Sequence, residues 1–276
     1  MAQPLTLMAV HAHPDDESSS TGGVLARYSA EGMRTVVVTC TNGELGDGPG
    51  HVKPDEEGHD EQDVANRRLA ELKLACDHLG VSHLEMLGYH DSGMPEWRHK
   101  HRDEVFCNVP VDESAARLVE LFERYQPNVV VTYDDNDGYN HPDHLQAHRI
   151  TVAAVERTDL PAKLYLIARR RRDFERMWQL MREKGIQVPD RPAIDPERLK
   201  RMEDAERRIT TTVNVSKVAE AKWAALAAHA SQLDESWWRR FPPELFTEVF
   251  GHETFIRARD TTGASLPEDD LFAGLR

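Results

Sequence analysis

The sequence is poor in the features that mark secreted and membrane-spanning proteins. It has only three cysteines in 276 residues, Cys40, Cys76 and Cys107, and this odd, widely spaced set argues against a disulfide framework. No stretch approaches the roughly 18 consecutive apolar residues of a membrane helix. The N-terminus lacks the basic and apolar start of a secretory signal. We therefore expect a cytoplasmic protein with no membrane partner.

Basic residues are also in the minority. The chain has 34 Lys and Arg against 48 Asp and Glu, which gives a formal net charge of −14. Nucleic acids are bound by clustered Lys and Arg, so we expect no nucleic-acid partner. Hydrophobic residues make up 39% and charged residues 30%, a composition typical of a folded domain with a core. The length fits one large domain or a core with a smaller appendage.

Apolar, β-branched segments alternate along the chain with segments in which apolar residues recur every three or four positions. The expected helices begin near residues 24, 63, 112 and 142, and the expected strands are residues 5–10, 35–41, 83–87, 128–133 and 163–168. Strands that are apolar throughout are typical of a parallel sheet covered on both faces. We therefore predict an α/β fold of Rossmann-like type, with an open, mostly parallel sheet and helices on both faces.

The pattern changes after residue 170. The arginine run at 169–172 could suggest an anion site, but we interpret it as the solvated start of a helix. Residues 185–196 carry three prolines and end the regular alternation. A strand at 209–215, a helix at 219–229 and an aromatic segment at 237–255 follow. We predict a Rossmann-like core over 1–170 and a smaller α+β portion over 171–276 that completes the fold and the substrate cleft.

Two polar clusters follow the first and the fourth expected strands. They are residues 11–16 (HAHPDD) and residues 134–144 (DDNDGYNHPDH). Ligands of open α/β sheets gather at the carboxyl ends of the strands, so these clusters should meet although they are far apart in the sequence. Buried carboxylates are costly unless something pairs with them, and a metal ion would do so.

The residue types in these clusters fit a catalytic zinc site. His13 and Asp16 offer an imidazole and a carboxylate from one turn, and His141 and His144 lie three residues apart at a helix start that Pro142 favours. Two histidines and one carboxylate bind catalytic zinc and leave a fourth position for water. Zinc acidifies this water and polarises a carbonyl, which suits hydrolysis of an amide. Fe(II) accepts the same ligands.

Neighbouring side chains suggest the other catalytic roles. If Asp16 faces the metal, Asp15 points elsewhere and could take the proton of the attacking water. His141 or Tyr139 could stabilise the oxyanion that forms on the carbonyl. These residues together predict a metal-dependent amide hydrolase.

Other interpretations of the same residues stay open. Residues 13–16 alone could be a turn whose aspartate caps a helix. His148, one helical turn after His144, could compete as a ligand. A dinucleotide-binding protein is disfavoured, because the first strand is not followed by Gly-x-Gly-x-x-Gly and acids there would repel phosphate. A non-catalytic binding module is also disfavoured, because it would need neither a set of metal ligands nor a base and an oxyanion donor.

The stretches HPDDE at 13–17 and HPDH at 141–144, in this order and setting, resemble the LmbE-like, or PIG-L, zinc deacetylase family. The resemblance implies hydrolysis of an N-acyl group from an amino sugar. It also implies a role for each matching residue: metal ligands His13, Asp16 and His144, general base Asp15, oxyanion-stabilising His141, Asp143 as the support of a metal-site histidine, and Tyr139 as a mobile active-site tyrosine.

Further stretches resemble the mycothiol-related members of this family, among them RRLAEL at 67–72 and DSGMP at 91–95. This resemblance implies that Arg68 grips an inositol and that Asp91 lies near the sugar. ITTTVNVSK, AAHASQLD and EDDLFAGL in the C-terminal half resemble the amidase type. That type cleaves mycothiol S-conjugates into an N-acetylcysteine S-conjugate, or mercapturic acid, and glucosaminyl inositol. The alternative type deacetylates N-acetylglucosaminyl inositol.

Two features depart from the amidase pattern. Ser20 stands where the amidase type usually carries Lys and the deacetylase type carries Ser, and the loop at 46–62 is shortened. The loss of the Lys cation bears on how the cysteinyl side of a conjugate is held, and either difference is compatible with a specialised substrate such as a thiol conjugate from a natural-product pathway. We expect a small-molecule thiol conjugate or amino sugar as substrate, and a homo-oligomer is compatible with the sequence.

Overall fold

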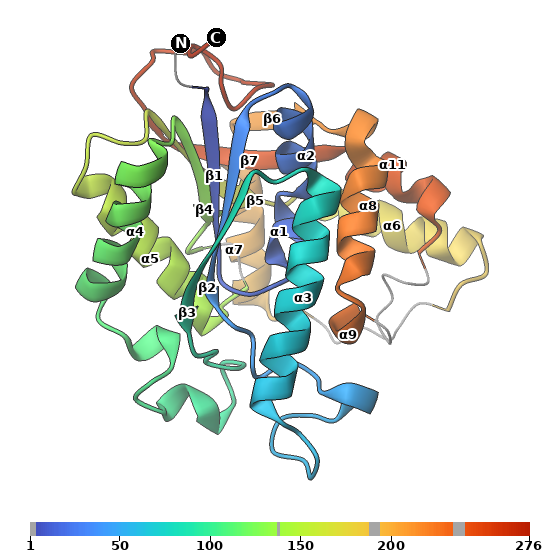
Figure 1. Ribbon diagram of the computed structural model, residues 1–276. Helices are drawn as coiled ribbons and strands as arrows, with labels where there is room; N and C mark the ends of the chain where they lie inside the picture. The colour runs from blue at the N-terminus through green and yellow to red at the C-terminus, as the bar shows by residue number, and fades with distance from the viewer. Residues whose placement is uncertain (1–3, 137–138, 188–193, 234–240) are drawn as a thin grey trace.

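The computed structural model describes residues 4–136, 139–187, 194–233 and 241–276. At its centre lies a seven-stranded sheet in the order β3-β2-β1-β4-β5-β7-β6 (Figure 1). Five strands run parallel: β1 (Thr6–His11), β2 (Arg34–Thr41), β3 (His83–Tyr89), β4 (Val129–Tyr133) and β5 (Lys163–Ala168). The predicted Rossmann-like, mostly parallel sheet is therefore confirmed.

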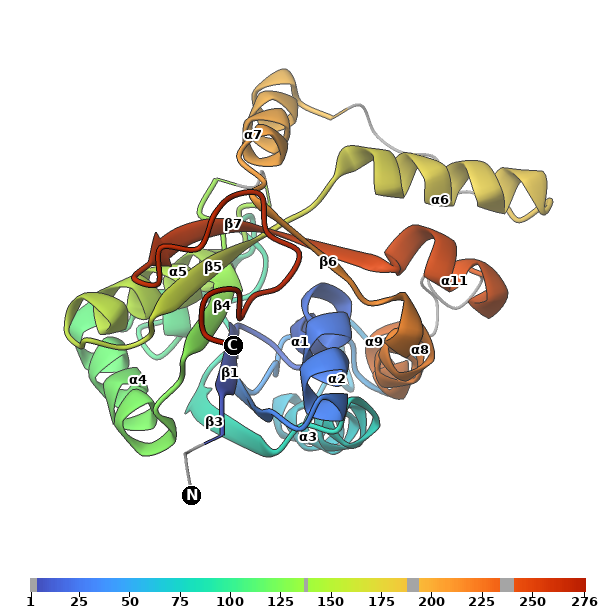
Figure 2. The same cartoon turned by 90° about the horizontal axis from the view of Figure 1, so that it is seen from above.

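Helices cover both faces of the sheet (Figures 1 and 2). One face carries α1 (Asp16–Ser20), α2 (Gly22–Ala30), α3 (Glu61–Leu79) and α8 (Ala219–Ala228). The other carries α4 (Val111–Tyr125) and α5 (Pro142–Glu156). Every residue of β1 and β4 is buried as a result, which explains why these segments are so apolar.

The C-terminal part adds two strands to the same sheet. β7 (His252–Asp260) pairs antiparallel with β5, and β6 (Thr211–Asn214) pairs antiparallel with β7. Figure 2 shows α6 (Arg171–Glu183) and α7 (Pro196–Arg207) on the far side of β7 from the parallel strands. Because strands from both sides of residue 170 form one sheet, the domain division there stays a prediction.

Among the described residues, the remaining helical segments are short. They are α9 (Ala230–Leu233), α11 (Pro243–Phe250) and the single turns Pro49–His51, Arg98–His101, Phe106–Asn108 and Ser216–Val218. Across the described part of the chain, none of the helices has the length and apolar character needed to cross a membrane.

Helix starts differ slightly from the sequence prediction, for identifiable reasons. α3 begins at Glu61 because the Asp60 carboxylate accepts hydrogen bonds from the backbone N–H groups of Gln62 and Asp63, at 2.9 and 3.0 Å. α4 begins at Val111 and has no side-chain cap. Part of the predicted aromatic segment at 237–255 lies outside the described residues, and the rest forms α11 and the start of β7.

The strand order reverses between β1 and β4. From β1 the chain moves outward through β2 and β3, and β4 starts the opposite direction toward β5. Ligands of open α/β sheets bind at such a reversal, beyond the carboxyl ends of the two strands. The two polar clusters follow β1 and β4 directly, so the fold places both of them at this point.

Candidate metal centre and active site

Side chains from the two polar clusters converge beyond the ends of β1 and β4. The ring centres of His13 and His144 are 5.5 Å apart. The Oδ2 atom of Asp16 lies 3.4 Å from Nδ1 of His13 and 3.4 Å from Nε2 of His144. Ligands held tetrahedrally about 2.1 Å from one zinc ion are about 3.4 Å apart, so both contacts of Asp16 have the spacing of shared ligands.

Other groupings of side chains could also hold a cation. Two sets of three described residues place one ligand atom each within 4.8 Å of one another: His13 with His141 and His144, and His13 with Asp91 and Asp143. Asp16 belongs to neither set. All the residues concerned are buried, so the structure offers a candidate metal centre with His13 at its middle.

Asp143 orients the imidazole of His13. Its Oδ2 atom lies 3.1 Å from His13 Nε2 and accepts the backbone N–H of Ser92 at 2.9 Å. Its Oδ1 atom accepts the Ser92 hydroxyl. A carboxylate that accepts the Nε2 proton leaves the Nδ1 lone pair of His13 free to face Asp16.

The carboxylates also give the site a negative potential. Burial acts to lower the pKa of His13, but Asp91, Asp143 and Asp16 outweigh it and raise that pKa well above its usual value. Positive charge at this point is therefore strongly favoured. A divalent cation fits both the donor atoms and the electrostatics.

Asp15 holds an unusual backbone conformation beside this centre. Its φ of 116° is in the region that favours glycine, and such strain is concentrated at functional sites. Arg68 donates to the carbonyls of Pro14 and Gly43, at 2.6 and 2.8 Å, and to Oδ2 of Asp15 at 3.1 Å. Glycine is required at position 43, where φ is +71° and a Cβ would overlap the guanidinium. Arg68 therefore holds the Asp15 carboxylate beside the candidate metal ligands, in a cavity that both residues line.

The turn interpretation of residues 13–16 describes only part of this geometry. Asp15 is the residue before α1, but its side chain makes no capping hydrogen bond. Asp16 does accept the backbone N–H of His13 at 2.9 Å, as in a turn, while the same oxygen faces both histidine rings. Neither carboxylate caps the helix that follows.

His141 and Tyr139 supply hydrogen-bond donors on the open side. His141 Nδ1 accepts the backbone N–H of Asp143 at 3.2 Å, which leaves the ring proton on Nε2. Burial, followed by the charges of His13 and His144, lowers the pKa of His141 to about 2, so the ring is neutral. The Tyr139 ring centre lies 5.2 Å from that of His144, and its side chain is 41% exposed. A neutral N–H and a phenol O–H can stabilise a developing oxyanion.

His148, the alternative ligand, faces elsewhere. Its Nδ1 donates to the backbone carbonyl of Tyr133 at 2.8 Å, and its Nε2 is 3.9 Å from Asp135. The ring therefore ties α5 to the end of β4. It does not take part in either set of ligand atoms described above.

Three contributors to the site were missed by the sequence analysis. Ser92 holds Asp143, and the ring of Tyr133 stacks on His144 with centres 3.9 Å apart. The third is His229, whose Nε2 lies 2.8 Å from the Glu17 carboxylate. Ser92 lies in DSGMP and His229 in AAHASQLD, two stretches in which the sequence resembles the mycothiol-related members of the family. This resemblance was the only sequence signal that could have pointed to the two residues.

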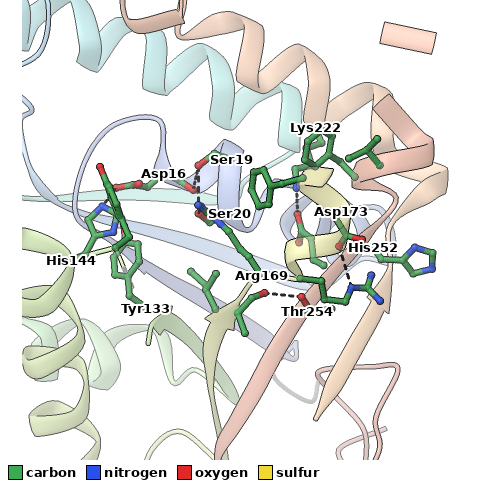
Figure 3. Close-up of a pocket in the computed structure, with 18 residues that line it drawn as sticks. Asp16, Ser19, Ser20, Tyr133, His144, Arg169, Asp173, Lys222, His252 and Thr254 are labelled. Atoms are coloured by element: carbon green, nitrogen blue, oxygen red, sulfur yellow. Dashed lines mark hydrogen bonds and ion pairs between the residues drawn. The ribbon is translucent and has the colours of Figure 1, made fainter. Parts of the chain in front are cut away.

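Two cavities open at the site and share Asp16, Tyr139 and His144. The first, of about 230 Å³, is lined by Arg68 and Asp91, two of the residues expected to bind substrate. The second, of about 300 Å³, contains the third of them, Ser20, and runs toward the C-terminal part (Figure 3). The expected substrate residues thus lie on two sides of one centre.

Fold and site together define an open α/β enzyme with a candidate metal centre. The family model described as "PIG-L: GlcNAc-PI de-N-acetylase" matches residues 8–155, more than half of the chain. The chain belongs to the PIG-L family, whose members are deacetylases and amidases, and it is an enzyme that acts on amide bonds.

Relatives with similar full-length sequences carry two names. The chain is 37% identical over 296 residues to the mycothiol S-conjugate amidase of Streptomyces coelicolor, covering 100% of this chain and 99% of the relative. It is 38% identical over 289 residues to the 1D-myo-inositol 2-acetamido-2-deoxy-alpha-D-glucopyranoside deacetylase of Acidothermus cellulolyticus, covering 98% and 95%.

The solved structure of N,N'-diacetylchitobiose deacetylase from Pyrococcus horikoshii has the same fold. Its TM-score is 0.60 at 18% identity, over 92% of this chain and 84% of that one.

Proposed function

We propose that this chain is a zinc-dependent amidase that cleaves the amide of mycothiol S-conjugates. The products are an N-acetylcysteine S-conjugate and glucosaminyl inositol. The observation that supports this choice is the second cavity, because it leaves room beside the ligand atoms for an acyl group much larger than acetyl. The full-length similarity to an amidase of this name agrees with it.

The second candidate is deacetylation of N-acetylglucosaminyl inositol. A relative with that activity in its name is as similar as the amidase, at 38% identity. Ser20, which matches the deacetylase type, also favours it.

We assign the metal to Nδ1 of His13, Oδ2 of Asp16 and Nε2 of His144. Asp143 is less suited as a ligand, because both of its oxygens already accept hydrogen bonds or face His13 Nε2. We assign the remaining ring nitrogen of His141, Nε2, to the oxyanion, because its Nδ1 already accepts the Asp143 N–H. Two imidazoles and one carboxylate suit zinc, and Fe(II) accepts them too. When bound, zinc polarises the scissile carbonyl and acidifies the attacking water.

Asp15 is the proposed general base. Its carboxylate takes a proton as the water oxygen adds to the acyl carbon, and it then delivers a proton to the amine nitrogen as the C–N bond breaks. Burial raises the pKa of Asp15, whereas Arg68 acts to lower it, and the net shift is upward. A raised pKa makes this carboxylate a stronger base and a usable acid.

His141 and Tyr139 are the proposed oxyanion donors. The neutral His141 ring presents Nε2–H, and Tyr139 lines both cavities. Donors placed where charge develops contribute on the order of 10²–10³ in rate each.

The sugar and the acyl group occupy different cavities in this proposal. Arg68 and Asp91 line the first cavity, where the glucosaminyl inositol would lie. Asp91 is positioned by the backbone N–H of Gly93, which donates to Oδ1 at 2.8 Å. The acyl side would then enter the second cavity, past Ser20.

The test is turnover by the zinc-loaded enzyme on two substrates in parallel. We expect kcat/KM for a bimane-labelled mycothiol conjugate to exceed that for N-acetylglucosaminyl inositol. A wide preference for the acetylated sugar would select the second candidate. No hydrolysis of either amide would reject both.

A further inference from the structure

The second cavity extends well beyond the candidate metal ligands. In Figure 3, Asp16 and His144 lie at one end, Lys222 and Asp173 at the other, and Arg169 between them. The cavity has a volume of about 300 Å³. One water molecule takes about 30 Å³ in the liquid, and an acetyl group has only three heavy atoms, each about the size of a water. An acetyl group would therefore leave most of this space unfilled.

Most charges around this cavity neutralise one another. The Lys222 ammonium lies 2.6 Å from the Glu253 carboxylate, and both side chains are buried. Arg170 Nε lies 3.1 Å from Asp173 Oδ2. Lys222 and Arg170 are each neutralised by a neighbouring carboxylate, so neither cation needs an anionic ligand.

Unlike Lys222 and Arg170, Arg169 has no described carboxylate as a close partner. It follows β5 directly and precedes the first residue of α6, so its side chain is not part of the helix start. Its Nη2 donates to the Ser20 hydroxyl at 2.7 Å. Within the described ranges, no carboxylate oxygen comes within 4.0 Å of this guanidinium. The residue is exposed toward the cavity, with further N–H donors available.

Apolar side chains form another part of the cavity wall. They are Ile167, Phe174, Val249 and Phe250. A guanidinium without a carboxylate partner binds carboxylates through two parallel hydrogen bonds, and an apolar wall favours a hydrocarbon chain. The matching occupant has an apolar body and one anionic end.

We propose that Arg169 is a specificity-determining residue that selects acyl groups longer than acetyl and ending in a carboxylate, which in a mycothiol S-conjugate would be carried by the S-substituent. This inference rests on the proposed function, because the acyl carbon must lie at the metal ligands for the chain to reach the cavity. The hydrolysis itself is unchanged: water adds to the acyl carbon, the C–N bond breaks and the amine nitrogen gains a proton. The sequence interpretation of 169–172 as a helix start fits Arg171 and Arg172 but not Arg169.

The experiment uses matched amides of glucosaminyl inositol. Succinyl is compared with butyryl and glutaryl with valeryl, so that each acid has a neutral partner of equal length, and the acetyl amide serves as reference. We expect kcat/KM for at least one acid to exceed that for its neutral partner by about tenfold, the worth of one charge-assisted hydrogen bond pair. Arg169→Gln should remove this preference, and Arg169→Lys should retain part of it.

Arg172→Gln is the matched control, because it removes a neighbouring charge whose side chain is 70% exposed and does not line the cavity. It should keep the wild-type preference. Equal rates for acid and neutral amides in the wild type, or a preference that survives Arg169→Gln, would overturn the proposal.

A binding measurement separates this inference from the proposed function. Calorimetry on the metal-free protein compares N-methylglutaramate with N-methylvaleramide. Tighter binding of the acid that Arg169→Gln abolishes supports the role of Arg169 even if no amide is hydrolysed. Equal binding of the two compounds contradicts it, whatever the turnover.

Discussion

The Nε2 atom of His229 lies 2.8 Å from Oε1 of Glu17, although the two residues are 212 positions apart and neither is exposed. The other oxygen of the same carboxylate accepts the backbone N–H of Asp15 at 2.9 Å. The C-terminal part of the chain is thus connected through one carboxylate to the strained peptide that carries the proposed base. His229 is a positioning residue in this account.

His229→Ala should therefore lower kcat on the order of tenfold, because residues that support a catalytic site from behind typically contribute 10–100-fold. Zinc content should stay near one per chain, since His229 touches no proposed ligand. Steady-state kinetics and metal analysis on the same sample check this. The exposed His78, replaced by Ala, is the control. A loss of metal together with activity would refute the positioning role.

Substitutions of Asp15 and His13 should differ in their effect on the zinc content of the protein. Asp15→Asn removes the proposed base but no ligand, so turnover should fall by about 10²–10⁴-fold with zinc retained. His13→Ala removes a ligand and should reduce the zinc content itself. Kinetics and metal analysis distinguish the two. If Asp15→Asn emptied the site while His13→Ala left it filled, the two roles would have to be exchanged.

Asp143 should act on metal affinity through His13. Without its carboxylate, the Nε2 proton of His13 loses its acceptor, and Asp143→Ala should weaken zinc binding by about 10–100-fold. Ser92→Ala removes one hydrogen bond to Asp143 and should have a smaller effect in the same direction. Competitive titration with a zinc chelator measures both. Unchanged affinity in Asp143→Ala would show that the His13 ring is held by other contacts.

Glu268 should control stability at neutral pH. This carboxylate is 5% exposed and accepts from Lys163 at 2.5 Å, from Tyr165 at 2.7 Å and from Arg257 at 2.8 Å. Glu268→Gln removes the carboxylate nearest to the buried Lys163, which keeps only the Ala273 carbonyl at 2.8 Å and Asp260 at 3.9 Å, and it should lower the free energy of unfolding by about 3 kcal/mol. Urea unfolding at pH 7 tests this, with the exposed Asp269→Asn as a control expected to change it by less than about 0.5 kcal/mol.

The same residue gives a signed pH dependence. Burial acts to raise the pKa of Glu268, but the hydrogen bonds from Lys163, Tyr165 and Arg257 outweigh it and hold the pKa below its usual value. A lowered folded-state pKa stabilises the protein above the unfolded value near 4.5, and this stabilisation is lost as the pH falls below it. The gap in stability between wild type and Glu268→Gln should therefore narrow from pH 5 to pH 3. A gap that widened would mean that the carboxylate is not stabilised as described.

The strands β1, β2, β4 and β5 could be predicted from the sequence because they are buried and mostly apolar. The edge strand β3 is only partly buried, so its sequence pattern is weaker. β7 could not be predicted in this way, since its last four residues are only partly buried or exposed, and the aromatic residues before it dominated the pattern. Its pairing with β5 depends on contacts far along the chain.

The convergence of the two polar clusters could also be predicted from the sequence. His13, Asp16, His141 and His144 lie in two compact motifs, and the strand order brings them together. Their supports come from elsewhere: Ser92 reaches Asp143 across 51 positions, and Arg169 reaches Ser20 across 149. No local pattern encodes such contacts, because only the packed fold determines which loops meet.

The measurement that bears most directly on the central claim is the position of zinc in a crystal of the loaded protein, located by anomalous diffraction. The account predicts one zinc bound by Nδ1 of His13, Oδ2 of Asp16 and Nε2 of His144, with the Asp15 carboxylate beside it and not bound to it. Zinc held by His13 with Asp91 and Asp143, or by the three histidines without Asp16, would contradict the ligand assignment and the catalytic roles built on it.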